Sequence, residues 1–473
     1  MARITGATSG KRDCCGKQLT IRIIILLFQY KHIEQSLSVI REQLSLFDVQ
    51  TKKAHVPSYQ LEFKDWDFAS ADTKIETHGF HPYPAMMIPQ IARLLIQMHG
   101  KKGQPLLDPF CGSGTALVEA RIAGLNSYGI DINPLALLLS KVKTTPLDIQ
   151  ILKKYSIRLC DDYLKTTIKL ADKKDSEIIP KFFNIDYWFR PKISRQLFVL
   201  KSVIDKIPEI DYRGFFLIAF SQTVRESSYT RNGEFKLFRM PAEQMEKFMP
   251  NVPELFFSIV QKNLPMMAEF ARAAKNNVFV NILDEDSRKT TAIPTKTVDL
   301  IVTSPPYGDS RTTVAYGQYS RLSLQWLGLP WEKVKNIDTI SLGGRKYSEF
   351  SGFKKYPHLM DIVKKIEIQD SKRVQDVASF FYDLELCFSE FKRVCKKNAI
   401  LCFVVGNRTV KGVKIPTDAI ITELGNNVGM KHIKTYTRNI PNKRMPSKNS
   451  PTNIEGQLGE TMTKEYIVVL KNN

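Results

Sequence analysis

Apolar residues recur along this chain at two different periods, and the two periods separate predicted helices from predicted strands. Five apolar residues near the N-terminus repeat at spacings of four and three: Ile33, Leu37, Ile40, Leu44 and Phe47. This spacing puts them on one face, so an amphipathic helix is predicted there. A second helix is predicted from Met87 to Ile96, after an extended entry marked by two prolines.

The stretch PLLDPFCGSGTALVEARIAGLNSYGIDINP, residues 105–134, predicts a strand-turn-helix-strand unit. The first short strand ends at Asp108, and the turn contains Gly112 and Gly114. A helix covers 116–123, and the second strand, 126–130, ends at Asp131. Small residues lie where the backbone must approach a ligand closely, and the unit predicts a parallel sheet.

Four later apolar runs predict further strands, at 277–283, 298–303, 399–405 and 465–470, and a helix is predicted over 377–394. Residues 135–275 show helical periodicity instead. The predicted organisation is an N-terminal helical extension (1–60), a first half of the catalytic domain (61–134), an inserted, mainly helical region (135–275) and a second half (276–473) that includes a loop-rich stretch, 308–375.

The net charge of this chain is unusual for a globular protein, whereas the rest of its composition is ordinary. Lys and Arg number 69 against 48 Asp and Glu, a formal net charge of +21, which favours a polyanionic partner such as nucleic acid. The seven cysteines form no CxxC pair, so reduced thiols, a cytoplasmic location and no structural zinc are expected. The apolar run Ile23–Phe28 is far shorter than the roughly 20 residues that span a bilayer, so no membrane association is expected.

The glycine turn favours a ligand that lacks phosphates. The third glycine of the dinucleotide fingerprint is missing, and no lysine follows Gly114 as it would in a phosphate-binding loop. Asp131, at the end of the second strand, is placed to accept hydrogen bonds from both hydroxyls of a ribose. An adenosyl ligand fits this pair of features. A tight turn with a capping aspartate is the purely structural alternative.

Three motifs together resemble the amino-group DNA methyltransferases: DPFCGSGT (108–115), TSPPYG (303–308) and HGFHPYPAMM (78–87). The resemblance implies an α/β fold with a Rossmann-like class I methyltransferase sheet that has helices on both faces, and S-adenosylmethionine as the cofactor. It implies these cofactor-binding residues: His81, Asp108, Phe110, Gly112, Gly114, Thr115, Asp131 and Asp286. The catalytic residues that it implies are Ser304, Pro305, Pro306 and Tyr307.

The chemistry of an exocyclic amine explains the residue types of TSPPYG. The amine lone pair is delocalised into the base, so the amine is a poor nucleophile. Hydrogen bonds from it to the Ser304 hydroxyl and the Pro305 carbonyl would localise the lone pair for attack on the sulfonium methyl. Pro306 would keep the turn rigid, and Tyr307 would stack on a base swung out of the duplex. This scheme needs no metal.

Serine before the two prolines favours cytosine N4 as the methylated atom, with adenine N6 as the alternative, because family members with Asp or Asn there more often resemble adenine enzymes. No Pro-Cys pair is present to serve a C5-cytosine enzyme. The expected partners are double-stranded DNA and a cognate restriction endonuclease of a restriction-modification system.

Two other functions remain open from the sequence. The tRNA guanine-N2 methyltransferases carry a similar glycine turn, although with Asp rather than Ser before the prolines. A non-catalytic DNA-binding subunit could retain the same fold. Recognition of DNA is expected from 135–275, with 308–375 as a mobile loop over the base. The candidate DNA contacts are Arg225, Arg231, Arg345 and Lys346.

Overall fold

The computed structural model describes residues 35, 37–39, 41–45, 65–231, 233–309, 313–347, 351–441, 448–449, 459–460 and 462–473. The described positions between 35 and 45 are helical, and Leu37 and Leu44 are buried, as the amphipathic spacing predicts. The apolar run at 23–28 lies outside the described residues. Within the described part of the chain, no helix is both long and apolar enough to cross a bilayer.

A seven-stranded sheet forms the centre of the catalytic domain, with the strand order β3-β2-β1-β4-β5-β11-β8. Its strands are β1 (Leu106–Asp108), β2 (Ser127–Asp131), β3 (Val280–Asp284), β4 (Val298–Thr303), β5 (Cys395–Gly406), β8 (Met430–Asn439) and β11 (Lys464–Asn472). The first five pair in parallel, whereas β11 is antiparallel to both of its neighbours. This arrangement confirms the predicted Rossmann-like sheet.

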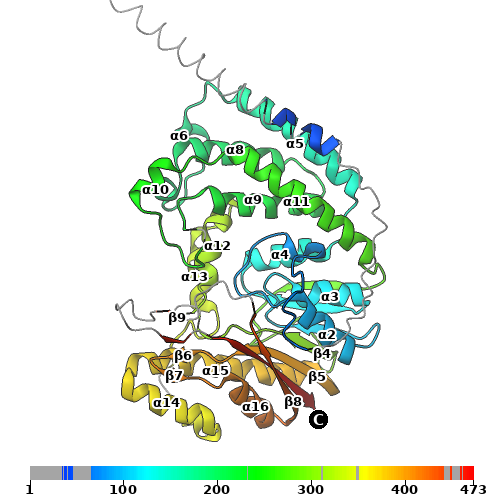
Figure 1. Ribbon diagram of the computed structural model, residues 1–473, viewed down its shortest axis with the longest axis vertical. Helices are drawn as coiled ribbons and strands as arrows, with labels where there is room; N and C mark the ends of the chain where they lie inside the picture. Colours follow the sequence, from blue (N-terminus) through cyan, green and yellow to red (C-terminus); the bar gives the residue numbers. More distant parts are fainter. Residues whose placement is uncertain are drawn as a thin grey trace, which may run out of the picture.

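Alternation along each central strand sends apolar side chains to two different layers of helices. In β4, Leu300 and Val302 join the core that includes α2 (Pro89–His99) and α3 (Thr115–Ala123). Ile301 joins the opposite core, formed with α14 (Pro357–Gln369), α15 (Ser371–Val394) and α16 (Thr417–Asn427). Helices therefore cover both faces of the sheet, as predicted (Figure 1).

A helical region lies between β2 and β3 in sequence. Its elements are α4 (Pro134–Thr144), α5 (Ile149–Lys169), α6 (Asp175–Ile178), α7 (Ile185–Trp188), α8 (Pro191–Ile204), α9 (Ile210–Ser227), α10 (Ala242–Lys247) and α11 (Val252–Ala273). The long helices α5, α8, α9 and α11 share one apolar core and lie away from the sheet (Figure 1). Helix α4 packs on β2 and β3, so it belongs to the catalytic domain by contact.

The prediction of a loop-rich stretch over 308–375 is wrong. Besides α14, it contains α12 (Tyr316–Trp326), α13 (Trp331–Ile340) and the 3-10 helix η2 (Ser351–Lys355). Helical spacing of buried apolar residues explains α14, since Leu359, Ile362, Val363 and Ile366 face the core. Helix α12 packs on α9, so it joins the helical region instead of forming a free loop.

The remaining short elements are η1 (Glu76–Gly79), the pair β6 (Thr409–Val410) and β7 (Val413–Lys414), and the pair β9 (Lys448–Asn449) and β10 (Gly459–Glu460). Of these, η1 matters most for the site, because it leads directly into the HPYP segment at residues 81–84.

Candidate active site

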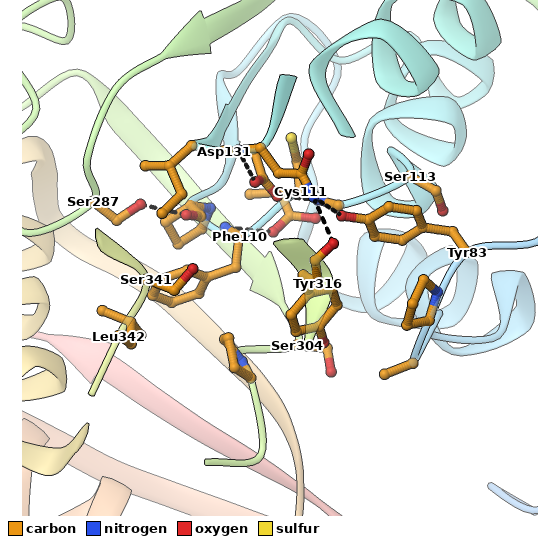
Figure 2. Close-up of a pocket in the computed structure, with 18 of the residues that line it drawn as sticks. Tyr83, Phe110, Cys111, Ser113, Asp131, Ser287, Ser304, Tyr316, Ser341 and Leu342 are labelled. Carbon is orange, nitrogen blue, oxygen red and sulfur yellow. Dashed lines mark hydrogen bonds between the residues drawn. The ribbon is translucent and has the colours of Figure 1, made fainter. Parts of the chain in front are cut away.

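A cavity opens at the carboxyl ends of β1, β2 and β4, where parallel sheets commonly bind ligands. Its volume is roughly 980 Å³ when the part that is open to solvent is included. Predicted site residues that line it are Asp108, Phe110, Gly112, Thr115, Asp131, Asp286, Ser304 and Pro306. In Figure 2, Tyr83 and Ser113 lie at one end and Ser287, Ser341 and Leu342 at the other, with Phe110 between them. The sheet thus brings eight predicted residues together.

The glycine turn is wound so that its backbone faces the cavity. Gly112 and Gly114 have φ of 49° and 83°, a left-handed region that favours glycine. A Cβ on Gly114 would also lie 3.0 Å from Ser140 Cα. Gly114 itself does not line the cavity. Its left-handed conformation and its close approach to α4 therefore determine the path of the turn, without a direct contact with the cavity.

Asp131 lies at the tip of β2, and both of its carboxylate oxygens accept backbone hydrogen bonds. The donors are the N–H of Gly112, at 2.9 Å, and the N–H of Asn133, at 2.8 Å. Burial raises the pKa of Asp131 to about 6, although these bonds partly oppose the shift. Each carboxylate oxygen keeps acceptor capacity for a hydroxyl group, as ribose binding requires.

Asp108 joins the cofactor turn to the catalytic strand. Its Oδ1 accepts hydrogen bonds from the Thr303 hydroxyl at 2.6 Å and from the Phe110 N–H at 3.2 Å. Burial raises the pKa of Asp108 to about 7. Thr303 is the first residue of TSPPYG, and Asp108 is the first residue of DPFCGSGT. Their hydrogen bond therefore fixes these two motifs relative to each other.

The SPPY turn presents alternate residues to the cavity. Ser304 and Pro306 line it, together with Gly308, whereas Pro305 and Tyr307 do not. The Tyr307 phenol instead donates a 2.9 Å hydrogen bond to Glu465 on β11. The expected stacking surface of Tyr307 is therefore not part of the cavity wall in this structure, and its partner Glu465 was not found from the sequence.

Asp286 lines the cavity and precedes Ser287, which lies at the same end of it as Leu342 (Figure 2). Arg288 donates to its two oxygens, at 2.9 Å from Nε to Oδ1 and 2.5 Å from Nη2 to Oδ2. Arg288 also pairs with the buried Asp383 at 2.9 Å. This double ion pair holds the Asp286 carboxylate in place while leaving it partly exposed.

His81 does not reach the cavity. Its two ring nitrogens are bonded to the Pro82 carbonyl and the Ser221 hydroxyl, at 2.6 and 3.1 Å, and burial lowers its pKa to about 4. Tyr83 lines the cavity in its place. The prolines of HPYP predict an extended segment, but they do not indicate which of its side chains enters the cavity.

Asn133 is a residue that sequence reasoning missed. Its side chain caps α4 by accepting from the Leu135 N–H, and its amide donates to the Tyr83 phenol at 3.1 Å and to the Ser320 hydroxyl at 2.8 Å. It therefore ties α4, the HPYP segment and α12 together at the cavity wall. The sequence signal was Asn before Pro134, a common start of a helix.

A buried ionic network joins η1, α2 and α3. The Arg93 Nε lies 2.7 Å from Glu119 Oε2, and the His78 Nε2 lies 2.9 Å from Glu119 Oε1. Burial raises the pKa of Glu76, a second partner of Arg93, to about 7. Glu76, His78 and Glu119 are close enough to hold a metal ion, but the Arg93 guanidinium already supplies the positive charge.

Lys143 on α4 is another buried cation near the glycine turn. Its ammonium donates to the Ser113 hydroxyl at 3.4 Å, and burial lowers its pKa to about 7. Ser113 lines the cavity at the Tyr83 end. A positive charge behind this end favours an anionic group there.

Arg225 is wrong as a candidate DNA contact. It is buried, its guanidinium stacks 4.1 Å from the centre of the Tyr319 ring, and it donates to the Tyr319 and Glu234 carbonyls. The other three candidates are exposed. Arg231 is paired with Glu234 at 3.7 Å and Lys346 with Asp376 at 3.4 Å, and Arg345 follows the cavity-lining residues 340–342.

The residues present fit S-adenosylmethionine. Asp131 offers two acceptors at the ribose position, the buried Lys143 favours a carboxylate at one end, and Phe110 with Leu342 provides an apolar slot at the other. Fold and site together define a methyltransferase that uses S-adenosylmethionine, with a proline turn that suits an amine substrate.

Comparison with known proteins identifies the family of methyltransferases to which this chain belongs. Residues 24–141 match the N6/N4 methyltransferase family described as DNA methylase. The type II methyltransferase M.MvaI from Kocuria varians is 41% identical over 86% of this chain and 93% of its own length. The type II methyltransferase M.BsoBI from Geobacillus stearothermophilus is 24% identical over 76% of this chain and 80% of its own length. This chain belongs to the amino-methylating type II DNA methyltransferases of restriction-modification systems.

A tRNA (guanine(10)-N2)-dimethyltransferase from Methanothermobacter thermautotrophicus matches a much smaller part. It is 44% identical over 52 residues, 11% of this chain and 16% of its own length.

Proposed function

We propose that this enzyme methylates the exocyclic N4 amine of cytosine in duplex DNA. The observation that carries the proposal is the position of Ser304, whose side chain lines the cofactor cavity directly after β4. A serine hydroxyl is a neutral acceptor, and serine at this point of the motif is similar to the N4-cytosine members of the family. The DNA protected in this way would be the target of a cognate restriction endonuclease.

The turn would act on the amine through two acceptors. The Ser304 hydroxyl and the Pro305 carbonyl would each accept an N–H of the amine, which draws the lone pair out of conjugation and toward the cavity. The cofactor supplies an electrophilic methyl group there. Holding amine and methyl in line accounts for much of the acceleration, because positioning alone contributes about 7–11 kcal/mol in well-oriented reactions.

Reaching the amine requires the cytosine to leave the duplex, because the target atom is otherwise enclosed by the stack. Helices α12 and α13 border the cavity through Tyr316 and Ile340, and Ser341 and Leu342 line it directly after α13. We assign sequence recognition to residues 135–275 and contacts around the extruded base to α12 and α13. The net charge of +21 supports binding to DNA phosphates.

Nucleoside mass spectrometry tests the assignment. Plasmid DNA is isolated from a host free of N4-methylcytosine that expresses the wild type or Ser304→Ala. N4-methylcytosine in the wild-type sample, lost in the variant, is the expected result. N6-methyladenine would overturn the choice of base, and unmodified DNA with confirmed expression would overturn the proposal.

A further inference from the structure

Two phenylalanine side chains are exposed on a hairpin that connects α9 to α10 (Figure 1). The described positions of this hairpin are 229–231 and 233–240. Phe235 and Phe238 are each 45% exposed. Phenylalanine is among the residue types that are most often fully buried, so two exposed rings on one hairpin indicate a surface that contacts another molecule.

Hydrogen bonds hold the hairpin in a fixed shape. The Arg231 N–H donates to the Phe238 carbonyl at 2.8 Å. The Met240 N–H donates to the Tyr229 carbonyl, also at 2.8 Å. These bonds pair the two arms of the hairpin, so the residues between the arms, including Phe235, are presented on a rigid support.

The hairpin is also held against α12. The Leu237 N–H donates to the side-chain oxygen of Gln318 at 3.3 Å. The Glu234 carbonyl accepts from the buried Arg225 of α9, which donates to a carbonyl of α12 as well. These contacts lie on either side of Phe235 in the chain, so the position of its backbone relative to α12 is fixed.

Aromatic rings connect Phe235 to the cavity. The centre of its ring lies 6.3 Å from that of Tyr319, and the Tyr319 centre lies 5.9 Å from that of Tyr83. Tyr83 lines the cavity, and so does Tyr316, which precedes Tyr319 by about one turn of α12. Tyr319 is buried, whereas Phe235 is exposed at the outer end of the series. Phe235 therefore lies on the surface two ring contacts from the wall of the cavity.

Positive charge on the hairpin favours DNA as the molecule that it contacts. Arg231 is exposed, and Lys236 and Arg239 are half-buried. Glu234, paired with Arg231 at 3.7 Å, is the acid among the described residues of the hairpin. An excess of basic residues favours binding to phosphates, and DNA is the substrate of the family to which this chain belongs.

We propose that Phe235 enters the duplex and fills the space that the target base leaves when it turns into the cavity. This inference rests on the proposed function, because it requires an extruded base. Extrusion costs the free energy of pairing and stacking. An aromatic ring inserted into the duplex restores part of the lost stacking. The rigid support of the hairpin matters because a mobile segment would lose conformational entropy on insertion.

Phe235→Ala tests the proposal on two duplexes that differ at a single base. The methylated site is first located in plasmid DNA from cells that express the wild type, by sequencing that detects modified bases. One duplex has the complementary base opposite the target, and the other has a mismatched base, which lowers the cost of extrusion. With the paired duplex, single-turnover methylation by Phe235→Ala should be about tenfold slower than by the wild type, the size of one lost contact between a base and an aromatic ring. With the mismatched duplex, the difference should shrink to about twofold.

Phe238→Ala is the matched control, because Phe238 has the same exposure on the same hairpin but lies outside the ring series that reaches Tyr83. Its rate should stay within about twofold of the wild-type rate on both duplexes. An equal slowing of Phe235→Ala on both duplexes, or an equal slowing by the two variants, would overturn the inference. An unchanged rate of Phe235→Ala on the paired duplex would also overturn it. Wild-type protein that leaves plasmid DNA unmodified would instead overturn the proposed function, and the inference with it.

Discussion

The backbone N–H of Gly112 donates a 2.9 Å hydrogen bond to Asp131 Oδ2, so the loop after β1 is tied to the tip of β2. The contact fixes the glycine turn and the Asp131 carboxylate relative to each other. Burial raises the pKa of this carboxyl group to about 6, and the hydrogen bond partly opposes that shift.

Cofactor binding should consequently weaken in mild acid. Below about pH 6, Asp131 gains a proton and loses acceptor capacity for the ribose hydroxyls, whereas above pH 7 it is ionised. Calorimetric titrations with S-adenosylmethionine should show the Kd rising as the pH falls from 7.5 to 5.5. Asp131→Asn should bind less tightly at pH 7.5, and the part of the pH dependence due to Asp131 should disappear. The same slope in wild type and variant would contradict this assignment.

Gly114→Ala should damage both stability and the site. Left-handed backbone costs an alanine about 1–2 kcal/mol, and the new Cβ would press on Ser140 Cα at 3.0 Å. Gly103 is the matched control, because its φ of 78° is similar and a Cβ there meets nothing within 4 Å. Urea unfolding should show a smaller loss for Gly103→Ala, and only Gly114→Ala should weaken cofactor binding. Equal effects would mean that packing against Ser140 is unimportant.

Arg93→Leu should destabilise the fold strongly, because it leaves Glu119 and Glu76 buried without their cation. Removing one partner of a buried pair typically costs about 3–5 kcal/mol. The exposed pair of Lys365 with Asp361 on α14 provides the comparison, and Lys365→Ala should cost no more than about 0.5 kcal/mol. Chemical denaturation of both variants measures the difference. A loss below about 1 kcal/mol for Arg93→Leu would show that the network is dispensable.

Arg345→Ala should weaken DNA binding through the phosphates. Arg345 is exposed and follows residues 340–342 at the cavity rim. Losing one phosphate contact should reduce the slope of log K against log salt by about one. Fluorescence anisotropy at several salt concentrations measures this slope, with Lys365→Ala as the control away from the rim. An unchanged slope would remove Arg345 from the interface.

The sequence was most informative where local chemistry determines structure. The apolar runs predicted β1, β2, β4 and β11 within a few residues, and the glycines located the turn between β1 and α3. Asp131 could be placed because it follows a strand directly. Each of these features depends on neighbours in the chain, so no knowledge of the fold was needed.

Prediction failed where contacts between residues far apart in sequence determine the structure. Strand β8 was missed because it lies at the sheet edge, where Lys431, His432 and Lys434 leave no clean alternation. Glu465 was invisible as a site residue, since its contact with Tyr307 joins positions 158 apart in sequence. His81 was misplaced because its motif resemblance says nothing of Ser221, which holds its ring away from the cavity.

The position of β11 also has a consequence for how the chain is made. This strand follows all the others of the sheet in sequence, yet it pairs between β5 and β8 and carries Glu465 to the catalytic turn. The helical region and β1 to β5 precede β11 in the chain, whereas the pairing of β5 and β8 with β11 must wait until β11 has been made. The catalytic turn therefore gains its contact with Glu465 only after β11 has entered the sheet between β5 and β8.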